Sequence, residues 1–144
     1  MPNLRLLPNQ PNTDLVTFSI LVNGVPVGNE IGVVSVAVNK EVNKIPWAKL
    51  IIQDGDVATE DFAISNQDTF KPGNEIEIQA GYHADDSTIF KGIIVKHGIK
   101  ILRDRHSLLE IECKDVVVKT TAGRKNKYFF DSKDTDVIEE ILNI

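Results

Sequence analysis

The stretch that decides the fold is residues 64–101, ISNQDTFKPGNEIEIQAGYHADDSTIFKGIIVKHGIKI. In residues 75–80, isoleucine and alanine alternate with glutamate and glutamine, which is typical of a strand with one buried and one wet face. Pro72-Gly73 precedes this strand as a turn, because proline presets φ and glycine accepts positive φ. A second apolar run, residues 89–95, follows a polar loop at 83–87. The stretch therefore predicts a half-buried antiparallel hairpin.

Four further segments outside this hairpin have the pattern of strands. Asn23-Gly24 ends the first of them as a two-residue hairpin turn, since a type I′ turn needs positive φ at both central positions. Between residues 57 and 70 the alternation fails, and residues 58–62 are predicted to form a short helical turn. The predicted strands are residues 14–22, 31–39, 46–53 and 106–113, with 116–119 extending or following the last. This pattern predicts a mainly β fold, an antiparallel barrel or sandwich.

The C-terminal end has helical spacing instead. Asp136 and Glu139 fit a capping box, and Val137, Ile138, Ile141 and Leu142 recur on one face. A helix this short is marginal when isolated, because isolated helices shorter than about 12–15 residues barely form in water. We therefore divide the chain into a β domain at residues 1–130 and the beginning of a following helical module at 131–144.

Apolar residues lie on both faces of three predicted strands, residues 31–39, 46–53 and 89–95. One buried face is enough for a lone barrel, so a second layer of the same chain or a partner subunit must cover the other. Trp47 lies opposite the face of Ala48 and Leu50, and interfaces favour tryptophan. The candidate interface residues are Trp47, Ile51, Phe62 and Phe70.

The composition excludes several classes of protein. The chain has 144 residues, of which 42% are hydrophobic and 26% charged, as in ordinary globular proteins. Its net charge of −5 argues against a general nucleic-acid partner, which needs a basic face. No apolar run reaches the ~20 residues that cross a bilayer, so stable membrane insertion is not expected. The first residues have no signal-peptide layout, so we expect synthesis in the bacterial cytoplasm, and any export needs another route.

No motif in the sequence indicates covalent chemistry. Nucleophile elbows, phosphate-binding loops and paired cysteines are absent, so we expect neither enzymatic activity nor a cofactor. The single cysteine, Cys113, has the spacing of a small buried apolar residue. His83, Asp85 and His97 flank the central hairpin and are the candidate metal ligands. Spacing alone brings fewer than three ligands together, so no metal site is predicted.

The central block also resembles a known family. The run FKPGNEIEIQAGYH at residues 70–83, with TIFKGIIVKHG at 88–98, is similar to the N-terminal region of VgrG-like (Vgr-type) spike proteins of contractile injection systems. KIPWAKL at 44–50, Asp54-Gly55-Asp56 and residues 134–142 resemble further parts of that family. The chain is shorter than such proteins, which continue into further hub domains and a needle.

That resemblance implies a phage tail-tube or hub-like barrel without covalent chemistry. The expected partners are two further copies in a homotrimer, the inner tube protein and other baseplate and spike proteins of type VI secretion or phage tail-like particles. Assembled into an injection particle, the chain would join inner tube to spike. The alternative from another class is a small ligand-binding β-barrel that binds carbohydrate or metal through Trp47 and the loop at 83–86, and an enzyme is the third possibility.

Overall fold

The computed structural model describes residues 16–28, 30–55, 61–82, 85–102, 107–123 and 126–142. Seven strands, two 3₁₀ helices and one α-helix follow one another along the chain in these ranges. The elements are β1 (Val16–Val22), β2 (Val25–Pro26), β3 (Val33–Asn39), β4 (Trp47–Gln53), η1 (Asp68–Phe70), β5 (Glu75–Tyr82), β6 (Asp85–Ile101), β7 (Ser107–Lys114), η2 (Val116–Thr121) and α1 (Asp134–Leu142).

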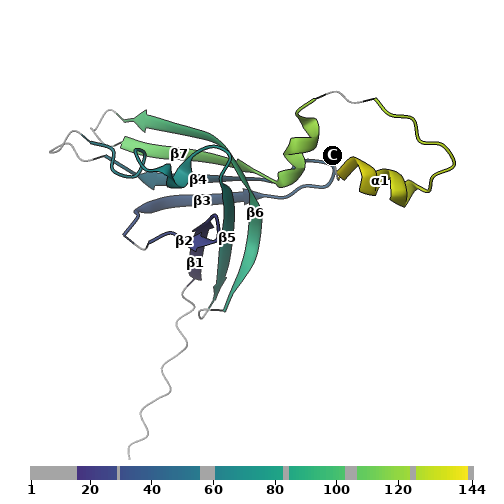
Figure 1. Ribbon diagram of the computed structural model, residues 1–144. Helices are drawn as coiled ribbons and strands as arrows, with labels where there is room; N and C mark the ends of the chain where they lie inside the picture. Colours follow the sequence, from purple (N-terminus) through teal and green to yellow (C-terminus); the bar gives the residue numbers. More distant parts are fainter. Residues whose placement is uncertain are drawn as a thin grey trace, which may run out of the picture.

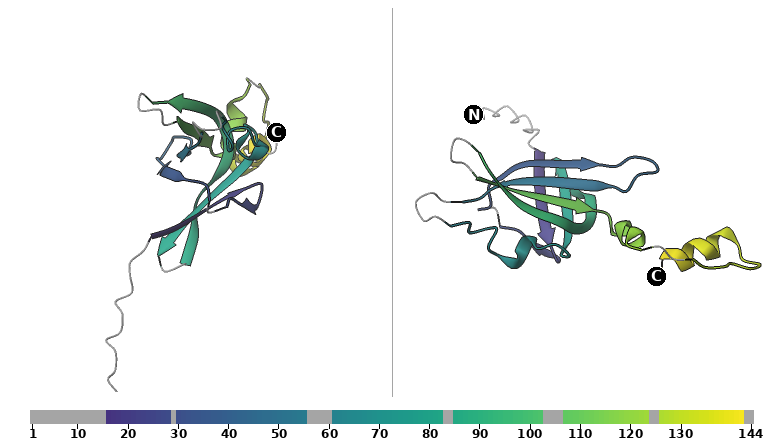
Figure 2. Two further views of the ribbon diagram at one scale, coloured as in Figure 1. Left: turned by 90° about the vertical axis from the view of Figure 1, so that its left-hand side faces the viewer. Right: turned by 90° about the horizontal axis from the view of Figure 1, so that it is seen from above.

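The strands form one antiparallel sheet in the order β2-β1-β5-β6-β7-β4-β3. The sheet folds over on itself, so that β1, β5 and the first half of β6 cross beneath β3, β4 and β7 (Figures 1 and 2). No hydrogen-bonded pairing joins β3 to β1 or β2 in the part of the chain that the structure describes. The prediction of a mainly β, antiparallel fold with a C-terminal helix is confirmed. The sheet, however, is not closed into a barrel.

Strand β6 forms the bend between the two layers. It pairs with β5 from Asp85 to Ile93 and with β7 from Ile93 to Ile101, and a register shift between Ile94 and Lys96 marks a bulge next to this change of partner. Bulges bend a strand and increase its twist. Gly92 lies just before the bend, where a Cβ atom would come within 2.2 Å of the Lys114 carbonyl oxygen. Only glycine allows β7 to pass this close.

The first hairpin follows the sequence prediction closely. Asn23 has φ of 51° and Gly24 φ of 79°, the positive values that a type I′ turn needs. The β1–β5 register places Ile20 opposite Ile78 and Val22 opposite Ile76. The predicted apolar face of β1 therefore packs towards the core.

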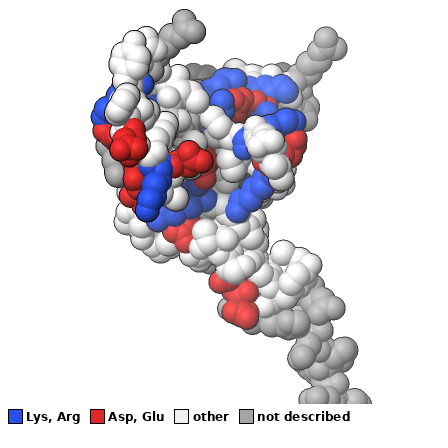
Figure 3. Space-filling model, turned by 90° about the vertical axis from the view of Figure 1, so that its right-hand side faces the viewer, with Lys and Arg blue, Asp and Glu red and all other residues white. Residues whose placement is uncertain are grey.

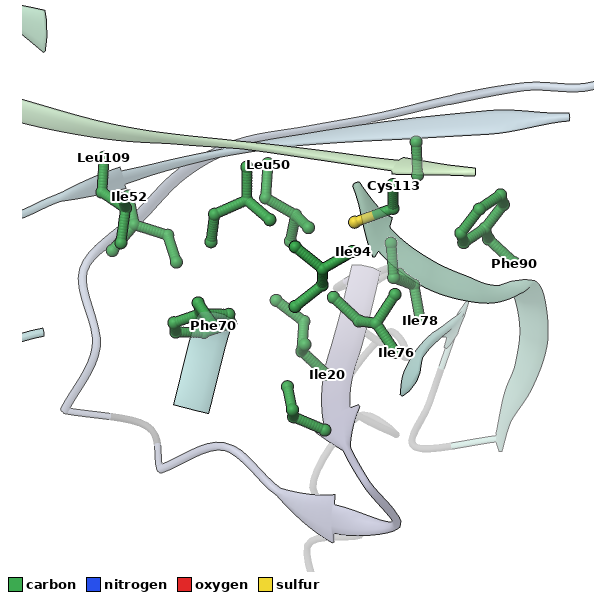
Figure 4. Packing of buried hydrophobic residues seen from close by; sticks show 13 residues of the cluster. Ile20, Leu50, Ile52, Phe70, Ile76, Ile78, Phe90, Ile94, Leu109 and Cys113 are labelled. Atoms are coloured by element: carbon green, nitrogen blue, oxygen red, sulfur yellow. The ribbon is translucent and has the colours of Figure 1, made fainter. Parts of the chain in front are cut away.

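The core lies between the two layers (Figure 4). Phe70 lies near Ile52 at one end of it, and Phe90 lies near Cys113 at the other. Both phenylalanine rings are buried, with exposed fractions of 0% and 1%. The remaining buried apolar residues are Ile20, Val22, Ala48, Leu50, Ile52, Ile76, Ile78, Ile94, Leu109, Ile111 and Cys113. All but Phe70 lie on strands, so the period-2 pattern of the sequence is the pattern of the core.

Three details differ from the sequence prediction. Strand β6 begins at Asp85, so the predicted polar loop at 83–87 is largely strand. Val116–Thr121 forms a 3₁₀ helix, because β7 loses its neighbours at Lys114 and the Asp115 side chain caps the Val117 amide. Helix α1 begins two residues before Asp136, whose carboxylate accepts from the backbone amide of Lys133. The predicted helical turn at 58–62 lies mainly outside the described residues.

No helix in the described ranges has the length and apolar character to cross a bilayer.

Candidate interaction surfaces

The C-terminal arm, which we define as residues 126–142, is the most exposed apolar part of the described chain. Tyr128 is 99% and Phe130 96% exposed. Helix α1 buries none of its residues, and Ile138, Ile141 and Leu142 lie on it with exposed fractions of 56%, 43% and 58%. The arm extends away from the sheet beyond η2 (Figure 1). The predicted helical stripe therefore exists, and the described residues leave about half of its surface uncovered.

Two polar contacts lie within the arm itself. Lys127 forms an ion pair with Glu140, and its Nζ lies 5.8 Å from the centroid of the Phe129 ring. Between η2 and the arm lies an open hollow of about 460 Å³, lined by Lys119, Thr120, Ala122, Gly123, Lys127, Phe129 and Ile141. Both partners of the ion pair are about half exposed, so it contributes little, about 0–1 kcal/mol. The arm meets the rest of the domain mainly through the few residues that line this hollow, so it is weakly attached.

A second apolar surface opens between the two layers. Val36 and Val38 of β3 face Val16 and Phe18 of β1 across a hollow of about 300 Å³, which Val34, Ala80 and Ile89 also line. Phe18 is 50% exposed, although it lies on the apolar face of β1, and Val34, at the bulge of β3, is 59% exposed. The layers diverge at this point, so the row of valines that the sequence predicts on β3 is only partly covered.

The outer face of β4 and β7 is covered by ion pairs. Lys49 binds Glu110 at 3.2 Å and Lys96 binds Glu112 at 3.0 Å, and Lys100 approaches Glu110 at 4.0 Å. Viewed from the side of the C-terminal end, acidic and basic side chains alternate without a continuous basic area (Figure 3). A face of mixed charge is typical of a solvent-exposed surface, and it lacks the continuous basic patch that binds nucleic-acid phosphates.

The four predicted interface residues lie in different environments. Trp47 is 41% exposed and lies opposite Lys114 and Asn39 at the ends of the neighbouring strands. Ile51 is half-buried on the outer face, where it lies between Ser35 of β3 and Glu110 of β7. Phe62 is half-buried, and its ring lies next to Gly55. Phe70 is fully buried in the core and cannot contact a partner. Sequence reasoning missed Tyr128 and Phe130, although a row of three aromatic residues between charged ones could have indicated them.

The candidate metal ligands do not converge. His83 lies outside the described residues, as does His106. Asp85 and His97 lie twelve positions apart on β6, on either side of its bend, where Asp85 pairs with β5 and His97 with β7. Among the residues that the structure describes, no three His, Cys, Asp or Glu side chains gather around a common point. The hairpin pairs to its far end, which separates the residues that we placed together.

Asp54, the one buried carboxylate among the residues that the structure describes, holds the loop that follows β4. Its oxygens accept from the amides of Gly55 at 2.9 Å, Ile64 at 3.0 Å and Ser65 at 2.7 Å, and from the Ser65 hydroxyl. Burial alone raises the pKa of this carboxyl, but the four hydrogen bonds outweigh burial and hold the pKa below its ordinary value of 3.8. All of the groups that donate to the Asp54 carboxylate belong to the loop that follows β4, so Asp54 has a structural role.

Cys113 is inert by its environment. It is 1% exposed in the core, and burial raises the pKa of its thiol to about 12. The reactive form of cysteine is the thiolate, which this pKa suppresses at neutral pH. The prediction of a buried apolar cysteine is confirmed.

These features define an antiparallel β domain with an exposed C-terminal arm. The chain matches the family model described as the Alg8 N-terminal domain over residues 12–144 and belongs to that family. The name states no activity for the domain. No curated protein sequence matches the chain.

This match corrects the identification that we drew from the central block. The family is that of the Alg8 N-terminal domain and not the Vgr-type spike family, so the predicted spike protein, and its role in joining inner tube to spike, is withdrawn. The resemblance rested on turns and on strand alternation, which unrelated β proteins share. The alternative of a carbohydrate- or metal-binding barrel is not supported either, since its candidate ligands lie apart and the sheet is open.

Proposed function

We propose that this domain is an assembly domain, a β scaffold that carries its C-terminal arm to a protein surface and does no covalent chemistry itself. The observation that carries the proposal is the exposure of Tyr128 and Phe130, at 99% and 96%. Exposed aromatic residues are enriched at protein interfaces, and a contiguous apolar patch on a domain marks an interaction site.

The partners that we propose for the arm are further copies of the same chain, with a homotrimer as the expected number. Ile138, Ile141 and Leu142 are spaced i, i+3 and i+4, so they form one stripe along α1. A nine-residue helix is marginal alone, but neighbouring copies of α1 can bury one another's stripes in a small bundle. Four acidic residues on each helix oppose this contact, so the association should strengthen as salt screens their repulsion.

Light scattering of the chain as a function of concentration and salt tests this function. We expect the mass to rise with protein concentration from the 16.0 kDa of one chain towards three times that value. In high salt, this rise should occur at a lower protein concentration. Replacing two central aromatic anchors, Tyr128→Ser with Phe130→Ser, should weaken the association by about a hundredfold, since each anchor in an interface contributes more than about 1 kcal/mol.

The matched control is Tyr82→Ser, which removes an aromatic residue with an exposed fraction of 58% from the far end of β5. This variant should associate like the wild type. An arm variant whose mass equals that of the wild type at every concentration would contradict the proposal, as would a wild type that stays at 16.0 kDa throughout.

A further inference from the structure

Strand β3 (Val33–Asn39) is an edge of the sheet. It pairs with β4 on one side, and among the described strands it has no neighbour on the other. Seen from above, β3 lies at the outer margin of its layer with open space beyond it (Figure 2, right). Alternate residues of such an edge direct their N–H and C=O groups away from the sheet, where another strand can bind them.

The protections that usually guard an edge strand are sparse on β3. Natural edges carry lysine or proline or are bent by bulges. The sequence of β3 is VVSVAVN, without charge or proline, and its register shift lies at the start, between Val33 and Ser35. Residues 35–39 therefore form a regular, uncharged edge with a high content of β-branched side chains, which favour strands.

The sequence of β3 is complementary to itself when a second copy runs antiparallel to it. With Val36 on the two-fold axis, Val36 faces the partner's Val36, and Ser35 faces the partner's Ala37. Valines thus meet valines on the face that lines the hollow, and small residues meet on the other face. An isologous contact requires such self-complementarity.

The charges that flank β3 also match in this arrangement. Glu30 precedes the strand and Lys40 follows it, and both are exposed. In the antiparallel pair, the end of one β3 lies beside the beginning of the other, so Glu30 of each copy lies near the partner's Lys40. The two-fold axis produces this opposite-charge contact twice, whereas a parallel pairing would place like charges together.

We propose that β3 pairs antiparallel with β3 of a second copy of this chain, which makes one continuous sheet across two copies. The contact extends the row of Val36 and Val38 across the junction and gives it a neighbour that the monomer lacks. It uses a surface distinct from the C-terminal arm, so it goes beyond the function proposed above. With a trimer through the arm, a two-fold contact leads to six copies.

Disulfide trapping with Val36→Cys tests the register directly. Directly opposite residues on paired strands have Cβ atoms about 4.5–5.5 Å apart, so mild oxidation should link two chains through position 36. The native Cys113 is buried and should not react. The control is Val25→Cys on β2, at the other edge of the sheet, which is 66% exposed and should remain unlinked under the same conditions.

Charge variants test the pairing without a cysteine. Ser35→Lys with Ala37→Lys places like charges opposite one another at two positions, and this should weaken the pairing about tenfold. Both side chains are exposed, so the monomer should keep its strand spectrum by circular dichroism. A one-to-one mixture with the chain carrying Ser35→Glu and Ala37→Glu should restore the association.

The outcomes separate this inference from the proposed function. Trapping at position 36 that persists in the Tyr128→Ser, Phe130→Ser background, with rescue in the charge mixture, supports pairing through β3 independently of the arm. Equal linking of Val36→Cys and Val25→Cys would overturn the inference. So would a lysine variant that associates like the wild type, or linked species that extend into fibres rather than stopping at pairs.

Discussion

Asp54 shows how one polar residue positions a loop. It follows β4 directly, and its carboxylate gathers the backbone of Gly55 and of residues 64–65, ten positions further along the chain. The Ser107 hydroxyl in turn donates to the Asp54 carbonyl oxygen, which ties this loop to the start of β7. Buried carboxylates are costly unless they are hydrogen-bonded, and this one is bonded on both oxygens. The loop that contains Phe62 is therefore anchored by a single side chain.

We expect Asp54→Asn to lower the free energy of unfolding by about 2 kcal/mol at neutral pH. The amide NH₂ group of asparagine would replace an oxygen that accepts hydrogen bonds, so that donors would face donors. The pKa of the Asp54 carboxyl is lowered in the folded state. Its contribution to the free energy of unfolding is therefore present above pH 3.8, the ordinary pKa, and is lost as the pH falls through the pKa of the folded state. Urea unfolding from pH 7 to pH 2.5 should show the difference between wild type and variant shrinking below pH 4.

The control for this prediction is Asp68→Asn, which removes an 84% exposed carboxylate paired only with Lys71. Its effect should stay within about 0.5 kcal/mol, as for most surface substitutions. A constant difference between the wild type and Asp54→Asn across the acid range would show that the hydrogen bonds do not lower the pKa of Asp54.

At the scale of elements, β6 decides how the sheet folds over. The sequence identifies its apolar centre at residues 89–95, but the strand runs from Asp85 to Ile101. Its first residues, Asp85 to Thr88, carry no alternating apolar pattern, and they are strand only because β5 pairs with them. Conversely, the valines at 116–118 have high β propensity but form a 3₁₀ helix, since no strand continues beside them. Pairing partners override local preference in both cases.

The bend of β6 should be sensitive to a single methyl group. Gly92→Ala places a Cβ atom 2.2 Å from the Lys114 carbonyl oxygen and 2.9 Å from the Phe90 ring, so β7 must shift. We expect a loss of about 1–3 kcal/mol, as for other overpacked sites, measured by urea denaturation.

Gly98→Ala on the same strand is the matched variant, because its Cβ would meet no heavy atom within 4 Å. It should be neutral or slightly stabilising, by up to about 1 kcal/mol, since alanine has less backbone entropy to lose. Equal losses for the two variants would contradict a specific close approach at Gly92.

For the whole molecule, Cys113 reports on the integrity of the core. It lies on β7 opposite Ala48 of β4 and Ile94 of β6, where the two layers meet. Alkylation by iodoacetamide requires the thiolate, and both burial and a pKa of about 12 oppose it in the folded state. We expect labelling to increase along the same urea transition as the loss of strand signal by circular dichroism. Rapid labelling without urea would mean that the layers separate before the domain unfolds.

The sequence by itself determined the strands and their inward faces. Alternation predicted that Ile76, Ile78 and Cys113 are buried, Asn23-Gly24 predicted its turn, and helical spacing located α1 close to its observed bounds. These features depend on side chains within a few residues of one another. The same local patterns led us to a family that the match over residues 12–144 corrects, because turns and alternation indicate β structure without specifying its lineage.

Only the tertiary structure decided which surfaces are left over. Phe70 was a candidate for an interface, yet it is fully buried in the core, whereas Tyr128 and Phe130 are almost fully exposed. Asp85 and His97 were candidate ligands of one metal ion, yet they lie on stretches of β6 that pair with different strands, Asp85 with β5 and His97 with β7. Exposure depends on which strands come to lie opposite one another, and that depends on contacts between residues far apart in the chain. Local spacing cannot supply them, and the open edge at β3 and the uncovered arm follow from them.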